Sequence, residues 1–388
     1  MNHERALRGR TAIVGVAESD LGEVGPDVTA LDLAAQAAYR ALDDAGLTTA
    51  DVDGLFAHSA FFPMPTVVLS EHLGIRPRFS DGTATGGSSF LAHVRHAAAA
   101  IEAGLCEVAL IVYGSNQRSA SGGLVSSGQL QVPSYETPFG ARLPVSAYAL
   151  AAARHMHEFG TKREHLAEVA VAARRWAQLN PVAFEQGDLS IDDVLAARMV
   201  STPLSVRDCC LVTDGGGAVV ITSAERARDL RQRPVYYLGG AEAQWHMNIS
   251  QLPDLTVTAA SESGPRAFDL AGLRPSDVDV VQLYDAFTIN VLLFLEDLGF
   301  CGKGEAKDFV SGGGIGPGGH LPVNTNGGGL SYCHPGMYGI FLLIEAARQV
   351  RGEAGDRQVP DAHIALAHGN GGMLSSQVTV LLGDESAL

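Results

Sequence analysis

Four short segments of the chain combine residue types that can carry out chemistry. The first, residues 85–89 (TGGSS), places Gly87 and Ser88 before a helical pattern, where backbone amides and the helix dipole favour an oxygen anion. The second is Tyr284-Asp285, directly after a buried strand pattern. The third is Cys333-His334 within CHPG, in which an imidazole that can bind or transfer a proton follows a glycine-rich run. The fourth, residues 368–372 (HGNGG), places His368 and Gly369 after the apolar run 364–367.

Each segment also has an ordinary structural interpretation. Glycines at 86 and 87 are typical of a turn that needs no side chain. A tyrosine at the end of a strand often only packs, and a single histidine is often structural. Other residues are weaker candidates: Cys209-Cys210 favours core packing, and His155 with His157 on a helical pattern favours a solvated or partner-facing surface.

The composition limits the class of protein. Hydrophobic residues make up 46% of the 388 residues and charged residues 18%, which is typical of a globular interior. The formal net charge of −16 argues against nucleic acid as a partner and requires local donors for any anionic ligand. The five cysteines show neither metal-ligand spacing nor a disulfide framework, which indicates reduced thiols and a cytoplasmic protein. No apolar run is long enough to span a membrane.

The elements that must position these segments belong to a duplicated chain. Residues 40–61 (RALDDAGLTTADVDGLFAHSAF) match residues 266–287 (RAFDLAGLRPSDVDVVQLYDAF) without a gap at 11 of 22 positions. One long match of this kind argues for two similar halves rather than for a short-period solenoid. The copies diverge at their ends, where His58-Ser59 of the first corresponds to Tyr284-Asp285 of the second. We therefore expect the chemistry where the halves meet.

Strand and helix patterns alternate in both halves. A strand is predicted at 11–17, followed by a helix that Thr29 and Asp32 cap and Gly46 ends. Such alternation predicts a largely parallel sheet covered by helices in each half. Residues 115–204 break the rhythm with helical patterns at 147–159 and 163–179, which indicates an inserted helical region. We expect this insertion to lie across the first half as a lid or partner surface.

These features together resemble the thiolase superfamily, in its lipid-transfer or sterol-carrier-protein branch. The motifs that carry the resemblance include YDAF, CHPGM, HEFGTKREHLAEVAV and TDGGGAVVITS, and they span nearly the whole chain. The resemblance implies a duplicated α/β thiolase fold with five layers, α-β-α-β-α, and an inserted helical loop domain. It implies an N-terminal half at 1–240, which contains the loop domain 115–204, and a C-terminal half at 241–388.

The resemblance also assigns the candidate site. The nucleophilic cysteine of thiolases would fall on Gly87, and Gly86, Ser88 and Ser89 are not cysteines either. Tyr284 matches the asparagine or histidine that helps to hold the thioester oxygen. His334 matches the histidine that serves as an oxyanion donor or base. The second reactive cysteine falls near His368. The related steroid side-chain aldolases have a second tyrosine in the loop that holds 332–334 here.

Three functions follow from this assignment. Without a thiolate at position 87 no acyl-enzyme forms there, yet the pocket can still stabilise an enolate. The first hypothesis is retro-aldol cleavage of a bulky β-hydroxyacyl-CoA, such as a steroid side chain, with Tyr284 as base or hydroxyl-binding group and His334 as oxygen ligand or proton shuttle. Gly87, Ser88, Cys333, His368 and Gly369 would line the substrate. A Tyr284 base would need a neighbouring cation or dipole to lower its pKa. The alternatives are a thiolase-type acyltransferase that uses Cys333 and a non-catalytic acyl-CoA or lipid-binding subunit.

The resemblance further implies partners and cofactors. It implies a two-fold homodimer and a small partner protein with a zinc ribbon and an OB-fold. The substrate would bring CoA with it, and the chain itself would need no cofactor and no metal. Zinc would be present only in the partner.

Overall fold

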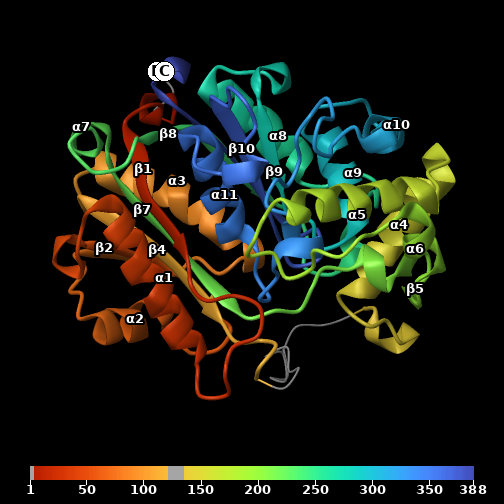
Figure 1. The fold of residues 1–388 in the computed structure, drawn as a ribbon, viewed down its shortest axis with the longest axis horizontal. Coiled ribbons are helices and arrows are strands. Elements are labelled where there is room, and N and C mark those ends of the chain that lie inside the picture. The colour runs from red at the N-terminus through yellow and green to blue at the C-terminus, as the bar shows by residue number, and fades with distance from the viewer. Residues whose placement is uncertain (1–3, 121–134) are drawn as a thin grey trace.

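The computed structural model describes residues 4–120 and 135–388 (Figure 1). Part of the insertion, residues 121–134, therefore lies outside the described residues. Two similar sets of strands form the frame of the molecule. The strands of the first half are β1 (Thr11–Glu18), β2 (Gly54–Ala57), β3 (Phe79–Asp81), β4 (Val108–Ser115) and β7 (Gly215–Ser223). Those of the second half are β8 (Val235–Gln244), β9 (Val280–Leu283), β10 (Ile364–Gly371) and β11 (Ser376–Gly383).

The order of the strands shows the duplication directly. Their hydrogen-bonded order is β3-β2-β4-β7-β1-β8-β11-β10-β9. Two residue pairs between β1 and β8 join the halves in the middle, and each half contributes one β layer. Strands β2, β3 and β4 are parallel, as are β9 and β10, whereas β7 and β11 run antiparallel to their neighbours. Both halves are therefore mixed, and the expectation of a largely parallel sheet is wrong. The antiparallel direction of β11 follows from its short connection to β10. Strand β8 pairs with β11 along most of its length, from Tyr236 to Gln244, and so belongs with the strands of the second half.

The helices complete five layers. Helices α1 (Ala30–Ala45) and α8 (Ala260–Ala271) cover the strands of one half each. Between them α3 (Ser89–Glu102) and α11 (Gly339–Arg351) contact each other and strands of both halves, so they form the middle layer (Figure 1). The remaining helices of the two halves are α2 (Pro65–Leu73), α7 (Ala224–Ala227), α9 (Thr288–Asp297) and α10 (Ala306–Val310). The predicted α-β-α-β-α arrangement is confirmed.

Local sequence signals explain the ends of these elements. Thr29 accepts a hydrogen bond from Asp32 N, and the Asp32 carboxylate accepts one from Thr29 N, which is the expected capping box at the start of α1. Gly46 ends that helix in the left-handed conformation, with φ of 73°. The first strand and first helix therefore form where the sequence predicts them.

The insertion packs on a different half from the one expected. Its elements are α4 (Val145–Phe159), α5 (Arg163–Gln178), α6 (Ile191–Ala196), β5 (Met199–Ser201) and β6 (Leu204–Ser205). Helices α4 and α5 contact α9, and α5 also contacts α10, so the insertion lies on the second half (Figure 1). A fully buried contact between His155 Nε2 and the Glu296 carboxylate, at 3.1 Å, joins α4 to α9. The expectation that the insertion crosses the first half is wrong, as is the surface role for His155, while His157 is exposed.

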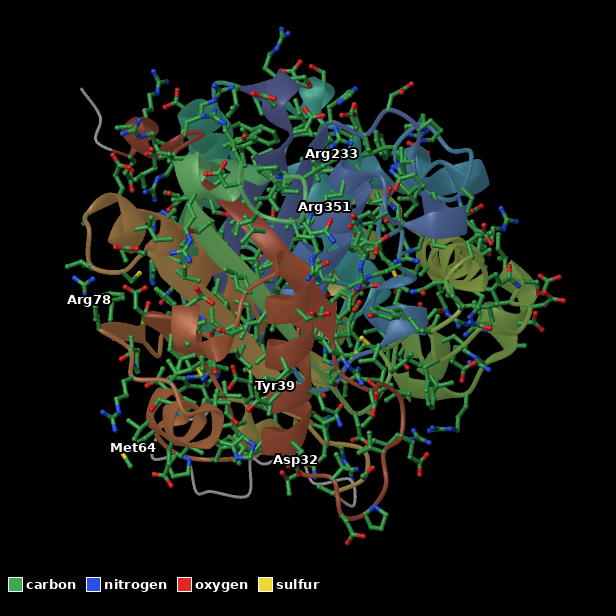
Figure 2. All side chains as sticks on the ribbon, turned by 60° about the vertical axis from the view of Figure 1, so that its left-hand side comes forward. Asp32, Tyr39, Met64, Arg78, Arg233 and Arg351 are labelled. Atoms are coloured by element: carbon green, nitrogen blue, oxygen red, sulfur yellow. The ribbon has the colours of Figure 1, made fainter. Side chains whose placement is uncertain are left out.

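Side chains at the outer edge of the first half point away from the molecule. Met64, which precedes α2 and is 66% exposed, and Arg78 before the edge strand β3 both project outward (Figure 2). No helix among the described residues is long and apolar enough to cross a membrane.

Candidate active site

Tyr284 and His334 meet between the two halves. Tyr284 follows β9, and its backbone N–H donates to the His368 carbonyl of β10 at 3.0 Å, which continues the pairing of the two strands by one residue. Its hydroxyl oxygen lies 3.1 Å from His334 Nε2. The two rings are nearly perpendicular, with an interplanar angle of 84°. Both side chains are buried, so water is largely excluded from the pair and its hydrogen bond is strengthened.

The start of helix α11 supplies a second partner for the tyrosine. The backbone N–H of Tyr338, the residue before α11, donates to Tyr284 Oη at 3.0 Å. Because the N-terminus of a helix carries partial positive charge, this contact favours negative charge on the phenolic oxygen. Tyr338 is not identifiable as a site residue from the sequence, because nearly every residue type can supply a backbone N–H donor.

Gly87 makes room for the tyrosine ring. A Cβ atom at position 87 would lie 2.1 Å from Tyr284 Cε2 and 2.7 Å from Tyr284 Oη. On the other side, a Cβ at Gly339 of α11 would lie 1.9 Å from the Gly87 carbonyl oxygen. Position 87 therefore accepts only glycine while Tyr284 keeps this position, and the ring fills the space in which a cysteine side chain would stand.

Burial sets the protonation of the pair. Burial raises the pKa of Tyr284 well above its ordinary value, although the hydrogen bond from Tyr338 acts in the opposite direction. Burial also lowers the pKa of His334 to about 4. A phenol and a neutral imidazole are thus the stable forms at neutral pH. The expected neighbouring dipole is present at the start of α11, but the pKa of Tyr284 is still raised, because the loss of hydration outweighs the helix contact.

Backbone and hydroxyl contacts hold the His334 loop in place. His334 N donates to Thr213 Oγ1 at 3.0 Å, and Thr213 N donates back to the His334 carbonyl at 3.3 Å. The Tyr113 hydroxyl donates to the Pro335 carbonyl and accepts from Met337 N at 3.2 Å. These contacts join the loop to β4 and to the segment before β7, so the first half orients the histidine.

Asp285 anchors the turn that leads to His334. Residues Gly328–Tyr332 form a single turn of π-helix, and the Gly329 N–H donates to Asp285 Oδ1 at 2.6 Å. Leu330 N donates to the other carboxylate oxygen at 3.3 Å. Burial raises the pKa of Asp285 to about 7. Asp285, the residue after Tyr284, therefore holds the loop that carries His334.

Two of the predicted substrate-lining side chains are committed to internal contacts. Ser88 is fully buried, and its hydroxyl donates to the Thr85 carbonyl at 2.9 Å and contacts Ser376 Oγ at 2.9 Å. His368 lies inside β10 rather than in a loop, and its ring nitrogens contact Thr379 Oγ1 and Gln377 Oε1, both at 2.9 Å. The loop prediction for His368 is wrong because residues 364–371 pair with β11 along their whole length.

Gly369 and Cys333 also serve packing. A Cβ at Gly369 would lie 2.7 Å from Leu91 Cδ1, so this glycine allows β10 to approach α3 closely. Cys333 is fully buried, and burial raises the pKa of its thiol, with Glu18 adding to the effect. Tyr332 donates its hydroxyl to Glu18 Oε1 at 2.8 Å. Because this hydroxyl is engaged there, Tyr332 does not act as the second tyrosine that the related aldolases have in this loop.

One thiol does lie near the tyrosine. Cys210 is an electrostatic neighbour of Tyr284, and its backbone N–H donates to the Ala286 carbonyl at 2.9 Å. Burial raises the pKa of the Cys210 thiol far above its ordinary value. Since the thiolate is the nucleophilic form, the raised pKa disfavours Cys210 as a nucleophile. Among the described residues, no three His, Cys, Asp or Glu side chains are placed to hold a metal ion.

Comparisons with known proteins agree with this architecture. Residues 241–384 match the family model described as "Thiolase C-terminal domain-like". The chain is 37% identical over 389 residues to the 17-hydroxy-3-oxo-4-pregnene-20-carboxyl-CoA lyase of Mycobacterium tuberculosis, covering 94% of this chain and 97% of that protein. It is 32% identical over 373 residues to an acetyl-CoA acetyltransferase of Methanothermobacter thermautotrophicus, covering 93% and 96%.

A solved structure is also closely similar. The "Ltp2-ChsH2(DUF35) aldolase" superposes with a TM-score of 0.88 at 33% identity, covering 98% of this chain and 99% of that chain. Relatives of similar overall identity thus include both a lyase and a transferase. The choice between these two reactions has to come from the site.

Proposed function

Because this chain belongs to the thiolase superfamily, in the branch that contains steroid side-chain-cleaving aldolases, we propose that it is a carbon–carbon lyase that cleaves a bulky β-hydroxyacyl-CoA. The observation that carries the proposal is the overlap between Tyr284 and any side chain at position 87. A thiolase needs a thiolate at that position, whereas a retro-aldol reaction needs only a proton acceptor and an anion site. The lyase from Mycobacterium tuberculosis supports a steroid acyl group as the substrate.

The Tyr284–His334 pair provides the proton acceptor. As the substrate's β-hydroxyl proton moves to Tyr284 Oη, the phenolic proton moves across the 3.1 Å contact to His334 Nε2. The relay avoids a free phenolate, which the raised pKa of Tyr284 disfavours, and the lowered pKa of His334 makes the imidazolium short-lived and favours return of the proton. It replaces the simpler hypothesis of a tyrosine base activated by a cation.

The bond changes balance without a co-reactant. Loss of the hydroxyl proton turns the β-carbon into a ketone as the Cα–Cβ bond breaks. The electron pair of that bond becomes the enolate of the shortened acyl-CoA. The proton held by the Tyr284–His334 pair then returns to Cα. The helix that begins after Gly87 stabilises the enolate oxygen through its first backbone amides and its dipole.

The state of the cysteine thiols argues against the acyltransferase alternative. Cys333 is fully buried, and both it and Cys210 have raised thiol pKa values. The alternative of a non-catalytic binding subunit does not explain why a phenol and a neutral imidazole meet at a helix N-terminus in a buried site. We therefore assign the activity to this chain.

The partners belong to the proposal as well. The name of the similar solved structure joins an aldolase to a second component, which supports a complex with a small partner. We propose that this partner has a zinc ribbon and an OB-fold, and that the chain forms a two-fold homodimer. Strand β3 at the edge of the sheet offers unpaired backbone groups for such a dimer. We also propose that the protein works in the cytoplasm, since none of its five cysteines forms a disulfide, and that it needs no cofactor beyond the CoA of its substrate.

The test is to incubate the protein, with and without such a partner, with a tertiary β-hydroxyacyl-CoA. We expect a ketone and a shorter acyl-CoA in equal amounts, with no consumption of free CoA. A strict requirement for free CoA would instead establish a transferase. Mass measurement of the mixed proteins under native conditions reports the homodimer and the heterocomplex separately from activity.

A further inference from the structure

We infer that a pocket beside Gly86 binds the uncharged ring system of the acyl group, an inference that rests on the proposed lyase function. This pocket has a volume of about 520 Å³. It lies among the end of β8, the turn between β10 and β11, and the segment before α3. We call it the Trp245 pocket, and its walls include Ala84, Thr85, Gly86, Trp245, Met247 and Gly372.

The pocket shares a wall with the catalytic site. Gly86 directly precedes Gly87, so their Cα atoms are only about 3.8 Å apart. Across the pocket wall, a Cβ at Gly86 would lie 3.1 Å from Gly372 N. The Gly372 carbonyl accepts a hydrogen bond from Tyr148 at 3.0 Å, and the Tyr148 ring stacks on Phe287 at 4.3 Å, three residues after Tyr284. The segment that makes room for the Tyr284 ring at Gly87 therefore also forms a wall of the Trp245 pocket at the preceding residue.

The lining identifies the chemical class of the ligand. No charged side chain is among the described residues that line the Trp245 pocket. Three other pockets each contain charged groups: Glu18, Asp20 and Arg40 in one, Arg5, Arg8 and Asp269 in the second, and Glu168, Arg175 and Asp192 in the third. A lining without cations does not suit the phosphates of CoA. Its volume, the Trp245 and Met247 side chains and its polar but uncharged residues (Thr85, Gln244, His246, Ser375 and Ser376) instead suit an uncharged ligand of steroid size.

Apolar surface in the pocket is left open to solvent. Trp245 is 38% exposed and Met247 is 51% exposed. Exposed apolar side chains that line a pocket are typical of a ligand site, because covering them removes apolar area from water. A flat ring system packed against the indole and the thioether would provide that cover.

The pocket is built before a ligand arrives. Trp245 N donates to the Ser375 carbonyl at 3.2 Å, and the indole Nε1 donates to Glu262 Oε1 at 3.0 Å. Burial lowers the pKa of His246, so the ring is neutral and its Nε2–H donates to the Met373 carbonyl at 3.0 Å. These bonds join the end of β8 to the turn between β10 and β11, and a side chain already held in place loses little entropy on binding.

The first test compares two substrates on one set of variants. One substrate is a tertiary β-hydroxyacyl-CoA with a tetracyclic steroid ring, and the other is the small analogue whose cleavage yields acetone. We expect Trp245→Ala to lower the ratio of kcat/KM values, steroid over small, by about tenfold or more, and Trp245→Phe to keep it within about threefold. Tyr39→Ala is the matched control, because Tyr39 is an exposed aromatic residue on α1 of the outer layer (Figure 2). An unchanged ratio in Trp245→Ala would overturn the inference.

The second test needs no catalysis. The chain has two tryptophans, so Trp176→Phe leaves Trp245 as the single tryptophan fluorophore. We expect a saturable change in tryptophan emission when a tetracyclic steroid ketone, the carbonyl product without CoA, is added. The same titration of Trp176→Phe/Trp245→Phe should show no such change. An emission spectrum that stays constant while the ketone inhibits cleavage would place the rings elsewhere.

The two tests separate this inference from the proposed function. Saturable binding of the ketone without any cleavage would leave the pocket standing and refute the lyase. Cleavage of both substrates, with an unchanged ratio in Trp245→Ala and no emission change, would leave the lyase standing and refute the pocket.

Discussion

The two halves of the molecule use equivalent strand ends for different purposes. Strand β9 ends at Tyr284, which meets His334 and the start of α11. Its counterpart β2 ends at His58, whose pKa is lowered by burial and which lies near the fully buried His93. The duplicated scaffold alone therefore does not make a site. The second half supplies the tyrosine, and the first half supplies the glycine at 87 that leaves room for it.

The largest effect on this difference between the halves is expected when the Tyr284 hydroxyl is replaced by hydrogen. Tyr284→Phe removes the proton relay, so we expect kcat to fall about 10³-fold or more. Tyr338 N then loses its acceptor, which is expected to lower the free energy of unfolding by roughly 1–3 kcal/mol. Ketone release and urea unfolding measure the two effects. The counterpart His58→Phe should retain turnover, and unchanged turnover in Tyr284→Phe would remove the tyrosine from the mechanism.

A smaller loss of activity is expected from a substitution at Gly87, the residue that the first half contributes to the site. Gly87→Ala places a methyl group against the Tyr284 ring, so the ring must shift away from His334. A displacement of about 1 Å is expected to lower kcat about 10²-fold. Gly82→Ala in the same segment is the control, because its Cβ would meet only Ala57 O at 3.8 Å. Equal rates for the two variants in a steady-state assay would contradict the packing argument.

The pH dependence of stability tests the anchor of the His334 loop. Burial raises the pKa of Asp285 from 3.8 to about 7, so the folded state holds a proton between these values that the unfolded chain releases. Its contribution to stability is full below pH about 4 and is lost as the pH rises through 7. In the wild type, the free energy of unfolding measured with urea should be lower at pH 8 than at pH 5 by on the order of a few kcal/mol because of this group. Asp285→Asn should remove that difference. An identical pH dependence in wild type and variant would show that Asp285 does not titrate in this range.

The smallest effects are expected at the two thiols nearest the site. Cys210→Ala and Cys333→Ala remove thiols whose raised pKa values disfavour the nucleophilic thiolate form. We expect cleavage rates within about threefold of wild type, with a modest loss of stability from the cavities. Complete loss of turnover in either variant would restore a thiol to the mechanism.

The sequence predicts the scaffold well because its signals are local. The capping box at Thr29, the terminal Gly46 and the repeat locate the elements of both halves before any tertiary contact is known. The position of the insertion is not local information, because an apolar helical face does not specify which neighbour it packs on. The contact of His155 with Glu296 decides that question only in the folded chain.

The site is predictable in its residues and not in their contacts. Tyr284, His334 and Gly87 are identified correctly as neighbours. The overlap of ring and glycine, and the amide of Tyr338, depend on how α3 and α11 meet in the middle layer. The segment HGNGG has the composition of a loop, yet pairing with β11 extends β10 through Gly371 and places His368 inside a strand.

The most direct test of the account is the intact mass of the protein during a single turnover. The reconstituted protein is mixed with a limiting amount of the tertiary β-hydroxyacyl-CoA, and the reaction is stopped at intervals. At each time point the intact mass of the protein is measured and the ketone is quantified. If the Tyr284 ring fills the place of a nucleophile, the mass stays that of the unmodified chain at every time point as ketone accumulates. An acyl adduct that forms and decays at the rate of ketone release would contradict the account.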